Sequence, residues 1–264
     1  MTAKVSLADI ITISNFDPLK KMLKSTDENT LVIFDVDHVL IMPTDEYTLN
    51  RHPYRKELWQ EIERRISKEE WKKLYGITAS KAQWRIVEPS ILHIFTELKE
   101  RHIPTMALSS IYTGKFGNIE SIENWRVKQL HDLGFDFSIL TPIKIDLYIK
   151  ELEENDGIPT LKSGVMLTAQ VDKGKILEHV LRHANYHPKR IIFVDDQLKN
   201  LESLEKLSDK LKIKFDGLHY TAVSEMSLPV INKQTEKLRF QILEQSHQWL
   251  SHKEMAERNL IATE

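Results

Sequence analysis

The sequence contains no cysteine, which excludes disulfide bonds, thiolate zinc ligands and cysteine nucleophiles. Glycine and proline are sparse, with 8 and 9 residues in a chain of 264, so long flexible linkers are not expected. Neither sign of charge dominates, because 37 basic and 39 acidic residues leave a net charge of −2. This balance removes the electrostatic basis for binding nucleic acid, and we predict no nucleic-acid partner.

Long hydrophobic runs are also missing. A membrane-spanning helix needs about 20 consecutive apolar residues, and no part of the sequence approaches this length, so we predict no membrane span. Residues 5–13 are mildly apolar, but Asp9 interrupts them and no signal-peptide cleavage site follows. A cytoplasmic location is the default expectation, while export or delivery into a host cell stays open. The sequence indicates no oligomeric state.

The most informative part of the sequence is the hydrophobic run at residues 31–34, which is followed by Asp35 and Asp37. We predict a buried strand that delivers two carboxylates at its carboxyl end, where open parallel sheets bind ligands. Carboxylates this close repel each other, so a bound cation or a reaction would offset their cost. The alternative is a buried strand that simply ends in acidic turn residues, and a D-x-D pattern alone does not decide between them.

Three further signals follow in a fixed order along the chain. Ser109 ends a predicted strand, Lys173 precedes a predicted helix, and Asp195 and Asp196 follow a second strongly hydrophobic run. Taken singly, the serine is an ordinary strand-end hydroxyl and the lysine an ordinary solvated helix start. Each of these two has a rival close by in the sequence, namely Ser110 and Lys175. The ordered set of four signals is much rarer than any one of them.

Predicted strands alternate with amphipathic helices, which is typical of an α/β fold with a Rossmann-like parallel sheet and flanking helices. We assign residues 1–44 and 88–232 to this core, and residues 45–87 to a small helical cap inserted into it. Residues 233–264 are expected to form a C-terminal helix that packs on the core. Residues 135–140 are expected to be a strand. The aromatic residues of the cap are expected to pack in its interior rather than stack on a substrate: Trp59, Trp71, Tyr75 and Trp84.

The four signals together resemble the motifs of the haloacid dehalogenase-like (HAD) phosphohydrolase superfamily. Residues 35–39 match its D-x-D-x-[TV] motif, and the strand that ends in Ser109 matches its second motif. Lys173 and Gly174 match the lysine of the third motif, which is often followed by glycine, and the Asp195-Asp196 pair matches the acidic fourth motif. The resemblance runs from about residue 30 to 220, and beyond these motifs the chain looks like an uncharacterised bacterial branch of the superfamily.

The resemblance implies a role for four catalytic residues. Asp35 would be the nucleophile that forms an aspartyl-phosphate, and Asp37 would act as general acid and then as general base. Ser109 would hydrogen-bond a phosphoryl oxygen, and Lys173 would pair with both the phosphate and Asp35. Members that cleave carbon–halogen bonds generally lack the second acid, so Asp37 favours phosphate esters.

The resemblance also implies Mg²⁺ as the cofactor, because this hard cation suits a few carboxylates plus water. Its ligands would be the Asp35 carboxylate, the backbone carbonyl of Asp37 and Asp196, with Asp195 in a supporting role. Asp196 lies four residues before Asn200, which is the spacing of the direct ligand in the superfamily, while the reverse assignment of the two acids stays open. The histidines are scattered along the chain, so we predict no zinc site.

The predicted function is a Mg²⁺-dependent phosphatase acting on a phosphorylated substrate of unknown identity. Enzymes that transfer phosphate within a sugar use the same acids, so hydrolysis rests on inference. The second hypothesis is a catalytically weak member that serves as a binding or interaction module, which the intact acidic and basic set disfavours. A response-regulator-like receiver with Asp35 as phosphoacceptor is a third, and its usual length is about half that of this chain.

Overall fold

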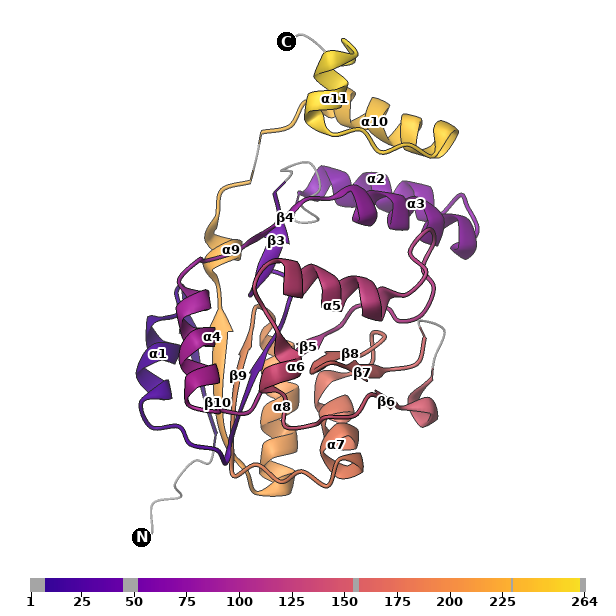
Figure 1. Cartoon of the computed structure of the whole chain (residues 1–264). Helices are drawn as coiled ribbons and strands as arrows, with labels where there is room; N and C mark the ends of the chain where they lie inside the picture. The colour runs from indigo at the N-terminus through magenta and orange to yellow at the C-terminus, as the bar shows by residue number, and fades with distance from the viewer. Residues whose placement is uncertain (1–7, 45–51, 154–156, 229, 262–264) are drawn as a thin grey trace. The chain divides into compact units, whose positions relative to one another are not determined.

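The computed structural model describes residues 8–44, 52–153, 157–228 and 230–261, and the chain forms two compact units (Figure 1). Three separate stretches of chain build each unit. Unit 1 consists of Met1–Ile41, Ile86–Gly114 and Ile122–Glu225, and unit 2 consists of Met42–Arg85, Lys115–Ser121 and Met226–Glu264. Within the described ranges, no helix combines the length and hydropathy that crossing a membrane requires.

Unit 1 is built on an eight-stranded sheet with the order β1-β10-β9-β2-β5-β8-β7-β6. Neighbours from β1 to β8 in this order are parallel, and β7 and β6 continue the sheet in antiparallel fashion. This mostly parallel sheet confirms the predicted α/β class. The strands are β1 (Ala8–Ile13), β2 (Thr30–Phe34), β5 (Thr105–Ser109), β6 (Leu147–Tyr148), β7 (Thr160–Lys162), β8 (Val165–Leu167), β9 (Arg190–Asp195) and β10 (Lys214–Tyr220).

Helices cover both faces of this sheet. Alternate residues of β2 point in opposite directions, so Leu31 and Ile33 join one hydrophobic cluster with residues of α7 and α8. On the other face, the ring of Phe34 lies 5.3 Å from that of Phe95 in α4. The helices of unit 1 are α1 (Asp17–Leu23), α4 (Ile91–Glu100), α5 (Ile122–Asp132), α6 (Phe137–Leu140), the 3₁₀ helix η2 (Lys150–Leu152), α7 (Lys173–His183), α8 (Leu198–Leu211) and α9 (Ala222–Glu225).

One local prediction was wrong. Residues 135–140, expected to be a strand, contain the short helix α6. The Asp136 side chain accepts a hydrogen bond from the Ser138 backbone N–H at 3.0 Å, which caps the helix start. Gly134 has a φ of +94°, a left-handed conformation that turns the chain after α5. These local hydrogen bonds and turn outweigh the strand preference of the aromatic and β-branched residues that follow.

Unit 2 contains the predicted cap together with the C-terminal segment. Its elements are α2 (Pro53–Glu63), α3 (Lys68–Lys81), α10 (Lys233–Ser246) and α11 (His252–Glu257), and β3 (Ile41–Pro43) pairs with β4 (Trp84–Ile86) where the chain passes between the units. Residues 45–51 of the predicted cap lie outside the described residues. The predicted single C-terminal helix is instead two, because His247 adopts a left-handed conformation with a φ of +54°.

The C-terminal helix packs on the cap helices, which differs from the expected packing on the α/β core. Phe240 and Leu243 of α10 join a hydrophobic cluster with Leu58 and Trp59 of α2. The Phe240 ring lies 5.2 Å from the Trp59 ring in an edge-to-face arrangement. The tryptophans of the described cap helices therefore pack in the interior of unit 2, and Phe116 from residues 115–121 joins them.

Three fully buried charged side chains lie where α10 packs on α2. Glu236 of α10 lies 3.7 Å from the guanidinium of Arg55 in α2 and 3.2 Å from that of Arg239 in α10. The exposed fractions of these three side chains are 0% or 1%. The two guanidinium groups also lie 5.1 Å and 5.3 Å from the ring of Trp249. Arg55 of α2 therefore takes part in a buried charged group with Glu236 and Arg239 of α10.

Candidate functional site

The carboxyl ends of β2 and β9 bring together acids from distant parts of the chain. The two strands pair in parallel with Phe34 opposite Val194, so Asp35 and Asp195 follow at the same edge of the sheet. The Asp35 backbone N–H donates to the Val194 carbonyl oxygen at 2.8 Å and extends this pairing by one residue. In the sheet order β5 and β9 flank β2, which makes this edge a switch point of the type where α/β sheets bind ligands.

Lys173 joins the two acids. Its Nζ lies 2.6 Å from Asp35 Oδ1 and 2.6 Å from Asp195 Oδ2, and its side chain is 2% exposed. The lysine is the first residue of α7, because the Asp172 side chain caps the helix by accepting from the Lys175 backbone N–H at 2.9 Å. A buried ammonium between two carboxylates is thus fixed by the start of a helix.

Close packing of α7 on α8 sets the position of this helix start. A methyl group added at Gly174 would come within 2.6 Å of the Ser203 backbone oxygen, which is closer than side-chain carbons are found to approach. The Gly174 backbone N–H also donates to Ser203 Oγ at 3.1 Å. The glycine therefore allows α7 to lie against α8 with Lys173 directed to the acids.

Burial controls the ionisation of this cluster. It raises the pKa of Asp35 well above its ordinary value, and while Lys173 opposes this, the carboxylates of Asp195, Asp196 and Asp37 raise it further. Burial likewise raises the pKa of Asp195, with Lys173 opposing. Burial alone would lower the pKa of Lys173, but its two carboxylate partners raise it above the ordinary value. The lysine therefore stays charged, and the raised pKa of Asp35 and of Asp195 reflects the cost of burying several carboxylates beside one ammonium.

The two acids at the end of β9 have different surroundings. Asp195 is fully buried, and Asn200 Nδ2 lies 3.0 Å and 3.1 Å from its two carboxylate oxygens. The Asp196 carboxylate instead accepts from Gln197 Nε2 at 2.9 Å and lies 3.6 Å from His38 Nδ1. Burial would raise the pKa of Asp196, but hydrogen bonds from His38 and Gln197 lower it overall.

Three carboxylates here can face one cation. Oxygen atoms of Asp35, Asp195 and Asp196 all lie within 4.8 Å of one another. With Lys173 as the only ammonium in contact with them among the described residues, the ionised cluster has two negative charges in excess. An all-oxygen donor set with this charge fits a hard divalent cation such as Mg²⁺.

Asp37 lies beside this cluster and has its own partners. Its Oδ2 is 3.5 Å from Ser109 Oγ at the end of β5 and 3.1 Å from Nη2 of Arg126 in α5. Arg126 is 2% exposed, and its Nη1 donates to Gln129 Oε1 at 2.7 Å. A buried guanidinium and a buried hydroxyl therefore hold one oxygen of a carboxylate that is itself 36% exposed.

The structure thus brings Asp35, Asp37, Lys173 and Ser109 together at one edge of the sheet with the Asp195–Asp196 pair. Lys173 and Ser109 are buried, whereas their alternatives in the sequence are less so: Lys175 is exposed and Ser110 is half-buried. Asn200 contacts Asp195 rather than Asp196, and the assignment of Asp196 as the direct metal ligand stays a prediction. Arg126 is not among the residues predicted from the sequence, because it stands in a charged helix and shows no motif that would distinguish it.

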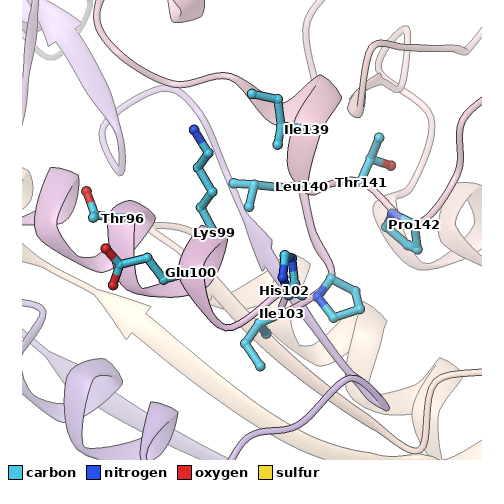
Figure 2. A pocket seen from close by; sticks show the side chains of 10 residues that line it. Thr96, Lys99, Glu100, His102, Ile103, Ile139, Leu140, Thr141 and Pro142 are labelled. Carbon is cyan, nitrogen blue, oxygen red and sulfur yellow. The ribbon is translucent and has the colours of Figure 1, made fainter.

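The pocket in Figure 2 lies elsewhere in unit 1. Its volume is about 650 Å³, and side chains from α4, from the segment before β5 and from α6 surround it, among them Lys99, Pro104 and Leu140. Pro104 directly precedes β5, whereas Ser109 is the last residue of that strand. The pocket is therefore at the opposite edge of the sheet from the acids, and it takes no part in the candidate site.

Comparison with known proteins places the chain in a family. The model of the family described as "Protein of unknown function (DUF2608)" matches residues 12–256. The chain belongs to this family. Relatives include an uncharacterized protein from Rickettsia bellii, 22% identical over 219 residues that cover 78% of this chain and 74% of that protein. Another, from Rickettsia prowazekii, is 24% identical over 217 residues that cover 80% of this chain and 74% of that protein.

Solved structures include a distant match. A hydrolase described as a haloacid dehalogenase-like family protein from Streptococcus pneumoniae matches 74% of this chain and 96% of its own chain. The sequence identity is 11% and the TM-score is 0.40.

Proposed function

We propose that this protein is a Mg²⁺-dependent phosphatase that hydrolyses a phosphate monoester through an aspartyl-phosphate intermediate on Asp35. The observation that carries the proposal is the convergence of Asp35, Asp195 and Asp196 with the Lys173 ammonium at the carboxyl edge of the sheet. Phosphoryl transfer depends mainly on positioning and on the neutralisation of spread negative charge. The cluster supplies a carboxylate nucleophile and a fixed positive charge. With all three carboxylates ionised, its excess negative charge would be neutralised by a divalent cation.

Asp35, Asp196 and the backbone carbonyl of Asp37 would hold the Mg²⁺, with Asp195 supporting the site through Lys173 and Asn200. The accessibility of Asp196 supports its assignment as a direct ligand, because 16% of its side chain is exposed against 0% of that of Asp195. When bound, the ion would reduce the repulsion between the anionic nucleophile and the anionic phosphate.

The proposed reaction has two steps. In the first, a carboxylate oxygen of Asp35 forms a bond to phosphorus while the bond from phosphorus to the leaving oxygen breaks, and Asp37 gives that oxygen a proton. In the second, a water oxygen bonds to phosphorus and Asp37 accepts a proton from the water. The bond between Asp35 and phosphorus then breaks with its electron pair returning to the carboxylate, and inorganic phosphate leaves.

Three cationic or hydroxyl groups would position the reactants. Lys173 would hold Asp35 and neutralise a phosphoryl oxygen, and Ser109 would donate a hydrogen bond to another. We assign Arg126 as a positioning residue, because its guanidinium contacts the oxygen of Asp37 that also faces Ser109. Arginine suits this purpose, since its planar group offers several donors in a fixed geometry.

The test is turnover of a generic aryl phosphate with and without Mg²⁺ by the native protein and by Asp35→Asn. We expect metal-dependent activity that falls by at least about 1,000-fold in the variant, because the amide cannot act as the nucleophile. The matched control is Lys175→Ala, an exposed change two residues from Lys173 that should keep native activity. Circular dichroism should show that all three proteins are folded.

Labelling gives a second measurement. After brief incubation with a labelled phosphate donor and acid quenching, the native chain should carry phosphate, and Asp35→Asn should not. Equal turnover by the native protein and the variant would contradict the proposal. Absence of turnover with every divalent metal and every phosphate class tested would favour the alternative, a protein that binds a partner without catalysis.

A further inference from the structure

A second group of metal-ligand side chains lies on the outer face of α7. His179 and His183 are separated by one helical turn, and their rings stack with centroids 6.1 Å apart. Glu151 of η2 faces both of them, with its Oε1 3.3 Å from His179 Nδ1 and 3.3 Å from His183 Nε2. The expectation that no zinc site exists overlooked this H-x-x-x-H spacing.

The distances match the coordination shell of a small divalent metal. Nitrogen and oxygen ligands lie roughly 2.0–2.2 Å from Zn²⁺ in a tetrahedral arrangement, which places neighbouring ligand atoms about 3.3 Å apart. The two contacts from Glu151 have this separation, and the ligand atoms of all three residues lie within 4.8 Å of one another. One ion could therefore contact all three without a change of backbone.

The neighbouring hydrogen bonds leave the required lone pairs directed at the site. His183 Nδ1 lies 2.8 Å from the His179 backbone oxygen, which accepts only, so this nitrogen carries a proton and Nε2 is the ring nitrogen left to bind a metal. Histidines that bind metals commonly donate their other ring nitrogen to a carbonyl in this way. Arg182 Nη2 donates to His179 Nδ1 at 3.0 Å, which marks that nitrogen as an acceptor. Arg182 is exposed and can turn away from it.

We propose that Glu151, His179 and His183 form a Zn²⁺ site that joins η2 to α7, with water completing the coordination. Two imidazoles and one carboxylate suit Zn²⁺ and similar late first-row divalent ions, whereas Mg²⁺ prefers an all-oxygen shell. The site is separate from the acid cluster, because His179 lies about 9 Å further along the helix axis than Lys173. It binds an ion for which the proposed phosphatase reaction has no use.

The experiment is calorimetric titration of tag-free, metal-stripped full-length protein with Zn²⁺ in the presence of excess Mg²⁺, which occupies the acid cluster. We expect one Zn²⁺ per chain in the native protein, and affinity at least about 100-fold weaker in His179→Ala and in His183→Ala. Glu151→Gln should also weaken binding. His93→Ala, which removes an exposed histidine of α4 outside the group, is the matched control and should bind as the native protein does.

Two further measurements keep the proposal falsifiable. Co²⁺ in place of Zn²⁺ should give visible absorption of a tetrahedral or five-coordinate site in the native protein and not in His183→Ala. Zn²⁺ should raise the midpoint of thermal unfolding of the native protein only. Unchanged Zn²⁺ affinity in all three variants, or loss of binding in Asp35→Asn instead, would overturn the proposal. Phosphatase turnover with Mg²⁺ should be unaffected in His183→Ala, so the two proposals stand or fall separately.

Discussion

Removal of the buried negative charge of Glu236 should lower the free energy of unfolding of the protein. The size of this loss follows from the contacts of Glu236. The substitution Glu236→Gln keeps the shape of the side chain and removes only its charge. The guanidinium groups of Arg55 and Arg239 would then lose a carboxylate at 3.7 Å and 3.2 Å while staying fully buried. The change therefore isolates the electrostatic contribution to the packing of α10 on α2.

The expected cost is about 3 kcal/mol. Removing one member of a buried ion pair usually costs about 3–5 kcal/mol, because the remaining charge is left without compensation in a low-dielectric interior. The contacts of both guanidinium groups with the Trp249 ring persist and offset part of this loss. We therefore take the lower end of the range, which is a large part of the total stability of roughly 5–15 kcal/mol of a typical domain.

The assay is urea unfolding followed by tryptophan fluorescence. Four of the five tryptophans are in unit 2, namely Trp59, Trp71, Trp84 and Trp249, so the signal reports mainly on that unit. A loss of about 3 kcal/mol should lower the urea midpoint by about 1–2 M. If the units unfold in separate steps, the shift should be confined to the step that this fluorescence follows.

A matched control lies on the same helix. Glu244 of α10 pairs with Arg65 at 3.0 Å, but 58% of the arginine side chain is exposed. Glu244→Gln should therefore cost less than about 1 kcal/mol. If Glu236→Gln destabilised the protein no more than this control, the buried carboxylate would not be what holds α10 to α2, and the account of unit 2 would fail.

Three further predictions concern the candidate site. Arg126→Lys should retain more turnover than Arg126→Met. Both variants should lose kcat rather than gain KM, because the guanidinium positions Asp37 rather than the substrate. Equal losses of kcat in the two variants would contradict this role. Gly174→Ala should destabilise the fold by about 1–3 kcal/mol in urea unfolding and lower activity, since the added methyl group would collide with Ser203; native stability would show that α7 shifts freely. Removal of divalent metal by chelation should abolish turnover reversibly while circular dichroism stays unchanged, and activity that survives chelation would exclude the Mg²⁺ role.

Much of unit 1 follows from the sequence because its signals are local and strong. Strands β2 and β9 are continuous hydrophobic runs, as expected of strands buried on both faces, and α8 has its leucines at helical spacing. Acids placed directly after such strands must lie at the same edge of a parallel sheet. The site residues Asp35 and Asp195 could therefore be predicted to converge without knowledge of the structure.

The features that could not be predicted depend on partners far away in the sequence. The buried stripe of α10 includes Glu236 and Arg239, which in isolation are typical of a solvent-exposed face. Their burial depends on contacts with other parts of the chain, among them Arg55 on another helix and the ring of Trp249. Arg126 is a similar case, because its buried guanidinium pairs with Asp37, which is far away in the sequence. The His179–His183 spacing was visible in the sequence, but its significance depends on Glu151, which the fold brings to the same place.

The way the chain divides between the units has a consequence for biosynthesis. The sheet of unit 1 is complete once β10 has left the ribosome, whereas the aromatic core of unit 2 still lacks Phe240, Leu243 and Trp249 at that stage. During this interval Trp59 and its neighbours on α2 and α3 have no helix to cover them, and exposed apolar surface of this kind attracts chaperones and promotes aggregation. Nascent chains should therefore acquire protease resistance in two stages, with unit 1 protected before unit 2.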